Sequence, residues 1–168
     1  MIPVSGYTTA PWSDFAVAVV GAAAALTGLL FVAVSLNIDR ILALATLAGR
    51  SGSTLILFAV PLTVGVLVLI PDQPATALGL ELVAIGLAAG GALLSISARV
   101  GRGPEEPHVS WLVLRLGTSI TVAAFLLVAG VTVIVGSGGG LYWVAPAVLE
   151  AFVAGLMTAW ILLVEIRR

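Results

Sequence analysis

Three acidic residues stand in or beside long apolar segments of the chain, where carboxylates are rare: Asp39, Glu81 and Glu150. Counted at about 1.5 Å per residue along a helix, Glu81 lies about 9 Å and Glu150 about 13 Å from the start of its segment. An ionised carboxylate deep in a membrane costs about 3 kcal/mol, so we expect it to be paired, hydrated or protonated. A proton relay, a cation site or a pore lining would use such groups. The structural alternative is a neutral carboxylic acid that is hydrogen-bonded between helices.

Other residues give little support for catalysis or metal binding. The spacing of Glu105 and His108 is that of a helical metal-binding pair, but Pro104 and Pro107 disfavour a helix there, and no second cluster of ligands exists. The chain has no cysteine and no lysine, so it forms neither a thiolate nucleophile nor a Schiff base. The glycine-rich residues 136–140 lack the following lysine of a phosphate-binding loop. We therefore predict that the protein is not an enzyme and holds no metal or cofactor.

The elements that carry Glu81 and Glu150 are predicted to be transmembrane helices, and Asp39 follows the first of the predicted helices. The sequence is 61% hydrophobic and 9% charged over 168 residues, with a mean hydropathy of +1.23. Each apolar segment has about the length that crosses a hydrocarbon core of about 30 Å. This pattern predicts an all-α bundle, a single domain over residues 1–168 in the lipid bilayer. The net charge of −1 argues against nucleic-acid binding. The five predicted helices cover residues 14–36, 54–70, 75–98, 112–135 and 141–165.

The arginines predict the orientation of this bundle. All seven basic residues are arginines, and they lie in or beside every second gap between the apolar segments or follow the last segment. Because basic residues are retained on the cytoplasmic side, the N-terminus is predicted outside and the C-terminus in the cytoplasm. No basic residue precedes Arg40, so we expect no cleavable signal peptide and a first segment that stays in the membrane. The arginines are Arg40, Arg50, Arg99, Arg102, Arg115, Arg167 and Arg168.

Residues 41–48 are too few to span a bilayer and too apolar to lie free in water. We expect a short helix on the cytoplasmic interface. The alternative is a continuation of the first helix that packs against a neighbouring subunit.

Small residues recur at intervals that place them on one side of a helix. Lipid tails are as apolar as leucine, so membrane helices associate by close packing over such residues. These residues therefore pack the helices of one chain or form an interface with another subunit, and both alternatives stay open. They are Gly21 and Gly28 in the first segment, Gly86 and Gly90 in the third, and Ala147, Ala151, Gly155 and Ala159 in the fifth.

The residues from Gly28 to Asn37, GLLFVAVSLN, follow Trp12-Ser13-Asp14-Phe15. This part of the sequence resembles a group of small uncharacterised multi-pass bacterial membrane proteins, some of which are labelled as modulators of a membrane protease. The resemblance covers mainly the first 50 residues. It implies a location in the bacterial cytoplasmic (inner) membrane and brings no catalytic residues with it.

Two functions fit these observations. In the first, the protein self-associates into a homo-oligomeric channel for ions or protons, and Glu150, Glu81 and Asp39 line or gate the pathway. In the second, it is an accessory or regulatory subunit of a larger membrane complex, and its small-residue faces bind another membrane protein.

Overall fold

The computed structural model describes residues 5–100 and 116–166, which are helices, short turns and links. Five helical segments in this part of the chain are long and apolar enough to cross a membrane. The prediction of an all-α bundle with five membrane-spanning helices is therefore confirmed. The helices are α1 (Ser13–Leu36), α2 (Ile38–Ala43), α3 (Ala45–Val68), α4 (Ala75–Val100), α6 (Thr118–Val135) and α7 (Val144–Ile166), and short 3-10 turns cover Ser5–Tyr7, Ala10–Trp12 and Gly140–Trp143.

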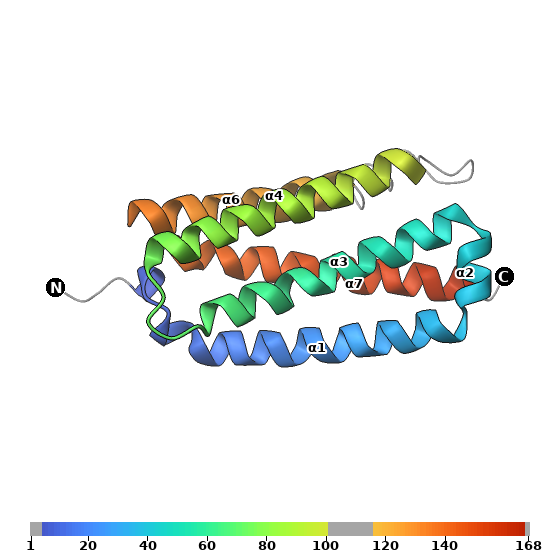
Figure 1. Ribbon diagram of the computed structural model, residues 1–168, viewed down its shortest axis with the longest axis horizontal. Helices are drawn as coiled ribbons and strands as arrows, with labels where there is room; N and C mark the ends of the chain where they lie inside the picture. Colours follow the sequence, from blue (N-terminus) through green and yellow to red (C-terminus); the bar gives the residue numbers. More distant parts are fainter. Residues whose placement is uncertain (1–4, 101–115, 167–168) are drawn as a thin grey trace.

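The long helices form three layers (Figure 1). α4 and α6 pack along each other in one layer, α3 and α7 form the middle layer, and α1 lies against α3 on the far side. One end of the bundle carries residues 5–12, 69–74 and 136–143, and we call it the turn end. The opposite end, which we call the arginine end, carries the three described arginines, Arg40, Arg50 and Arg99. The chain enters α1 at the turn end and leaves α7 at the arginine end.

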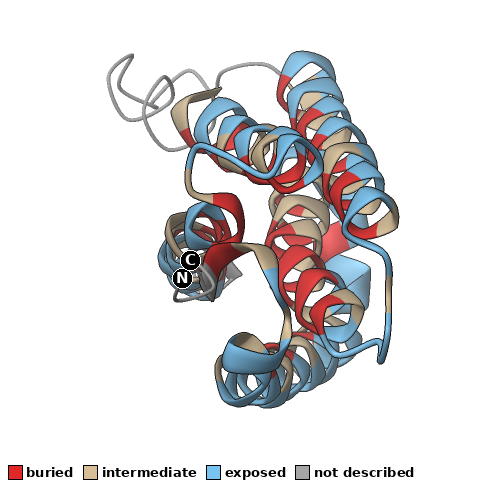
Figure 2. Ribbon diagram, turned by 90° about the vertical axis from the view of Figure 1, so that its left-hand side faces the viewer, coloured by how far each residue is buried: buried red, intermediate tan, exposed pale blue. Residues whose placement is uncertain are grey.

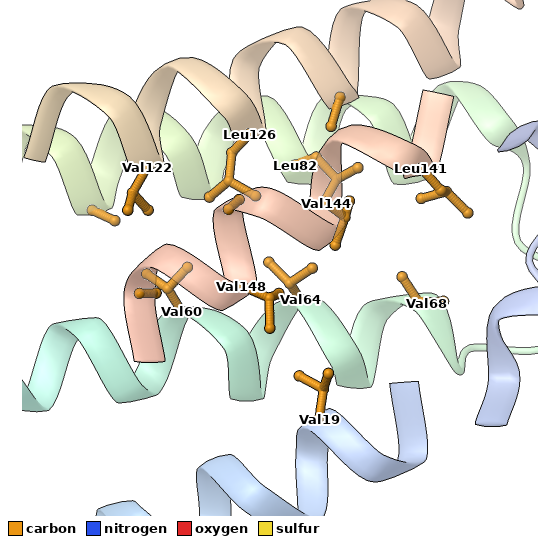
Figure 3. Close-up of a cluster of buried hydrophobic side chains, with 14 of the residues drawn as sticks. Val19, Val60, Val64, Val68, Leu82, Val122, Leu126, Leu141, Val144 and Val148 are labelled. Atoms are coloured by element: carbon orange, nitrogen blue, oxygen red, sulfur yellow. The ribbon is translucent and has the colours of Figure 1, made fainter. Parts of the chain in front are cut away.

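The core lies where the middle layer meets the other helices (Figure 3). Val64 of α3, Leu82 of α4, Leu126 of α6 and Val148 of α7 are each at most 2% exposed. The outer faces of the helices are exposed (pale blue in Figure 2), and they carry large apolar side chains such as Leu29, which is 68% exposed. Because lipid tails can cover such a surface, the core is held by close packing more than by exclusion of water.

The structure differs from the prediction at residues 41–48. Helix α2 ends at Ala43, Leu44 is extended with φ −129° and ψ 115°, and α3 begins at Ala45. These residues thus belong to two helices, and the second membrane-spanning helix begins at residue 45, ahead of the predicted residue 54.

Part of the segment that the prediction left out of the second helix is polar, and its hydroxyl groups form hydrogen bonds within α3. The hydroxyl groups of Ser51, Ser53 and Thr54 donate to backbone carbonyls four residues earlier, at 3.0, 3.0 and 2.8 Å. A polar segment whose hydroxyls are satisfied by their own helix can stay helical inside a membrane. The prediction relied on hydropathy alone and therefore placed the start of this helix too late.

Several sequence predictions lie outside the described residues. These concern the start of the 112–135 helix and the residues Glu105, His108, Arg102, Arg115, Arg167 and Arg168.

Candidate functional site

The three acidic candidates occupy three separate places in the bundle. Asp39 is exposed on the short helix α2 at the arginine end. Glu81 lies on α4 near the turn end, and Glu150 lies on α7. No hydrogen bond in the described part of the chain joins any two of these carboxylates. The three residues therefore form no continuous acidic pathway inside one copy of the protein.

Glu81 is bound to the turn that precedes its own helix. The side-chain amide of Gln73 donates to Glu81 Oε2 at 2.5 Å, and Glu81 is partly buried. Gln73 belongs to the link between α3 and α4, so this hydrogen bond fastens the turn to the second turn of α4. The contact gives Glu81 a structural role at the turn end.

The turn end is further closed by aromatic side chains and glycine backbone. The indole of Trp143 donates to the carbonyl of Gly138 at 2.8 Å, and the amide of Gly139 donates to the hydroxyl of Tyr7 at 2.9 Å. Gly138 and Gly139 have φ of +92° and +113°, which favour glycine. Residues 136–140 thus form a cap over the end of the bundle, and hydrogen bonds hold this cap in place.

Glu150 forms a hydrogen bond that joins α7 to α6. The hydroxyl group of Thr121 on α6 donates to Glu150 Oε1. Counted back from Val135 along α6, Thr121 lies about 21 Å from the turn end, and counted forward from Gly140 through the 3-10 turn and α7, Glu150 lies about 17 Å from it. In a hydrocarbon core of about 30 Å, this position is near the middle. Glu150 is therefore the deepest acidic residue in the described part of the chain.

A groove on the outside of the bundle contains this pair. The groove lies between α6 and α7 and has a volume of about 520 Å³. Its walls are mostly apolar, and Leu149 and Val153 are 61% and 63% exposed. The carboxylate thus faces the surroundings of the chain and not its core. The groove is lined by Gly117, Thr118, Thr121, Leu149, Glu150, Val153, Ala154 and Met157.

The hydroxyl proton of Thr121 has two acceptors within reach, Glu150 Oε1 and the carbonyl oxygen of Gly117. As a carboxylate, Glu150 accepts the proton of the Thr121 hydroxyl. As a carboxylic acid, it can donate to Thr121 Oγ1, whose own proton then bonds the Gly117 carbonyl at 2.9 Å. Glu150 therefore keeps a hydrogen bond with Thr121 in either protonation state, and the bond from Thr121 to the Gly117 carbonyl forms only when Glu150 is protonated. This arrangement suits a proton-exchanging site and needs no movement of the backbone.

Most of the predicted small residues contact neighbouring helices of the same chain. Ala147 and Ala151 are fully buried, and a Cβ added to Gly155 would overlap the ring of Phe58 on α3. A Cβ on Gly90 would lie 2.8 Å from Cβ of Ala123 on α6.

Gly86 also packs on α6, where an added Cβ would lie 3.1 Å from Leu126 Cβ. Ala159 is half-buried and lines an apolar groove between α1 and α7. Gly21 and Gly28 differ from all of these, since both are exposed and an added Cβ would have no atom within 4 Å.

The sequence analysis missed Gln73 and Thr121 as partners of the two glutamates. Gln73 had a usable signal, because it lies in a tight turn eight residues before Glu81. Thr121 had none, because its contact with Glu150 joins residues 29 positions apart and depends on how α6 and α7 are rotated. In the part of the chain that the structure describes, no group of three or more metal-ligating side chains occurs.

The fold defines this protein as a small polytopic helical membrane protein. Comparisons with protein-family models, curated proteins and solved structures found no match to this chain.

Proposed function

We propose that the protein is a non-enzymatic, homo-oligomeric channel of the bacterial cytoplasmic membrane that conducts protons or small cations between its copies. In this proposal the turn end lies outside the cell and the arginine end faces the cytoplasm, as the positive-inside rule predicts. The observation that carries the proposal is the Glu150–Thr121 pair in the open groove between α6 and α7.

The position of the groove supports a path between copies. A carboxylate that faces lipid near mid-membrane costs about 3 kcal/mol, so we expect protein or water to shield the groove from lipid. The three acidic residues form no continuous pathway within one copy. A path that uses Glu150 would therefore run where the α6–α7 grooves of two or more copies meet. Glu150 can keep its hydrogen bond with Thr121 whether or not it is protonated. This property favours protons over metal cations as the conducted species.

Flux measurements on purified protein in liposomes test this proposal. With an imposed membrane potential and a pH-sensitive dye inside, the wild type should move protons above the background of protein-free vesicles. Glu150→Gln keeps the size and hydrogen bonding of the side chain but cannot exchange a proton. We expect flux to fall by about 100-fold, which is within the usual contribution of a positioned proton-transfer group.

Glu81→Gln provides the matched control, because Glu81 is bound to Gln73 at the turn end. This variant should retain nearly all of the wild-type flux. Wild-type protein without flux for protons or common cations would refute the channel. Unchanged flux in a folded Glu150→Gln variant would remove Glu150 from the pathway.

A second candidate function is that of an accessory subunit, and the outer face of α1 favours it. Gly21, Ala24, Ala25 and Gly28 are all exposed there, although such residues usually mark helix contacts. Purification in mild detergent separates the two candidates. A channel should elute as a homo-oligomer, whereas an accessory subunit should keep a different membrane protein at a fixed stoichiometry and show no flux alone.

A further inference from the structure

An apolar groove runs along the outside of the bundle between α1 and α7, in the half nearer the arginine end, and we call it the α1–α7 groove. Its volume is about 310 Å³. Buried side chains form its floor, since Leu30 of α1, Phe58 of α3 and Leu162 of α7 are at most 6% exposed. Its edges are open, because Leu29 and Trp160 are 68% and 66% exposed. The groove therefore faces whatever surrounds the chain in the membrane.

The length of this groove matches one leaflet of a bilayer. Its lining on α1 extends from Leu26 to Asn37, which is about 17 Å at 1.5 Å per residue. Half of a hydrocarbon core of about 30 Å is about 15 Å. Helix α1 ends at Leu36 after 24 residues, so Asn37 lies where the chain leaves the core. The groove thus runs from the level of the lipid headgroups to about the middle of the membrane.

The shape of the groove suits a single acyl chain better than a helix. A helix with its side chains is about 10 Å across, so a 17 Å length of it occupies about 1,300 Å³. The groove offers about 310 Å³, so a helix of another molecule would rest on its edges without filling it. An unfilled groove loses van der Waals contacts along its floor. Because acyl chains are as apolar as leucine, one chain entering the groove restores these contacts.

The headgroup end of the groove carries a positive charge. Arg40 follows Asn37 by three residues, a spacing that places side chains on one side of a helix. The backbone amide of Ile41 donates to the Asn37 carbonyl at 3.0 Å, so Asn37 belongs to the first turn of α2. Asp39 follows Asn37 by two residues and does not share that side. Arg40 is exposed, and no carboxylate of the described chain forms an ion pair with it.

A phosphate group is the natural ligand for this end. A guanidinium group presents several donors in a plane that matches two phosphate oxygens. The side-chain amide of Asn37 donates one proton to the Ala33 carbonyl at 2.9 Å, and its second proton can bond a headgroup oxygen. A zwitterionic headgroup has its own ammonium beside the phosphate, whereas a headgroup with a net negative charge keeps its attraction to arginine.

We propose that the α1–α7 groove binds an anionic phospholipid from the leaflet at the arginine end. An acyl chain lies in the groove, and the phosphate lies at Arg40 and Asn37. The lipid would fasten α1, the long helix with the smallest buried share, to α7 (Figure 1). This inference requires only that the helices span a membrane, so it is independent of channel activity.

Tryptophan quenching in vesicles tests the site, with Trp160 as the reporter inside the groove. The full-length protein is placed in phosphatidylcholine, and a growing fraction is replaced by phosphatidylglycerol with brominated acyl chains, which quench tryptophan on contact. Brominated phosphatidylcholine serves as the matched probe. We expect half-maximal quenching at about fivefold less phosphatidylglycerol, the usual effect of one arginine at an anionic surface. Trp160→Phe should remove this preference.

Arg40→Gln separates the headgroup contact from the groove. Arg40 is exposed, so this variant should fold as the wild type does. It should quench equally with both lipids, because only the charge at the end of the groove is lost. Arg99→Gln is the control, since Arg99 is exposed at the same end on α4, in another layer. It should keep the fivefold preference.

Ala33→Phe tests the seat of the acyl chain. Ala33 is half-buried and lines the groove, so a phenyl ring there should fill it and abolish the preference while Arg40 stays in place. Ala88→Phe, at an exposed position of α4 outside the groove, should leave the preference unchanged. An unchanged melting temperature confirms that both variants are folded.

Three results would overturn the proposal. Equal quenching of the wild type by the two lipids would show that the groove takes any lipid without regard to its charge. A preference that persists in Arg40→Gln would place the anionic lipid elsewhere. Lipid quenching that is the same in the wild type and in Trp160→Phe would show that protein covers the groove, as a second copy of the chain would.

Discussion

The seam between α4 and α6 and the outer face of α1 contain the same kind of small residues but use them differently. In the seam, Gly79 and Gly130 bring two backbones together: a Cβ on Gly130 would lie 2.5 Å from the Gly79 carbonyl oxygen. On α1, Gly21 and Gly28 have open space where a Cβ would be. The glycines of the seam therefore contact another helix of the same chain. Gly21 and Gly28 have space beside them for a helix of another molecule.

The comparison matters for function because it separates packing from association. Close backbone contact gives membrane helices their van der Waals attraction. In the seam, this attraction holds the chain together. On α1, nothing in the described chain uses it, and α1 is also the long helix with the smallest buried share. Replacing glycine by alanine at matched positions of the two regions tests this difference.

The largest effect is expected for Gly130→Ala. The added methyl group would meet the Gly79 carbonyl oxygen and the Val83 amide nitrogen, 3.0 Å away, and backbone atoms cannot rotate aside. The helices would have to separate, and we expect a loss of about 3 kcal/mol in the free energy of unfolding. Unfolding in mixed micelles with increasing SDS measures it. A Gly130→Ala protein as stable as the wild type would show that the seam is not closely packed.

A smaller loss is expected for Gly155→Ala on α7. Its methyl group would meet the ring of Phe58, including Cδ1 at 2.9 Å, but a side chain can shift where a backbone cannot. We expect a loss of about 1 kcal/mol in the same assay. The double variant Gly155→Ala/Phe58→Leu makes room for the methyl group and supplies the check. If the effect of Gly155→Ala is the same in both backgrounds, the two residues do not interact.

Much of the fold could be predicted from the sequence, because membrane spans follow from length and apolarity alone. The five segments needed no knowledge of their neighbours. The start of α3 could not be found in this way, because hydropathy counts Ser51 and Thr54 as polar although their hydroxyls bond within the helix. A hydropathy scale does not include such hydrogen bonds, so it undervalues this part of α3 as a membrane helix.

The candidate site was less predictable, because it depends on the rotation of helices against one another. A carboxylate deep in a span could be recognised at Glu150, but its partner Thr121 is one of several hydroxyl residues on α6.

The smallest effect on stability is expected at Gly28 on the outer face of α1. With no atom within 4 Å of the added Cβ, Gly28→Ala should change the unfolding free energy by no more than about 0.5 kcal/mol. The larger Gly28→Leu should likewise leave the single chain stable, yet it would keep another helix from close approach to α1. Cross-linking in native membranes should therefore lose the species in which α1 contacts a neighbour, while Leu29→Ala, a change at an adjacent exposed position, should keep it. If Gly28→Leu destabilises the isolated chain as much as Gly130→Ala does, α1 packs inside the protomer. If it alters neither stability nor cross-linking, this face of α1 contacts lipid alone.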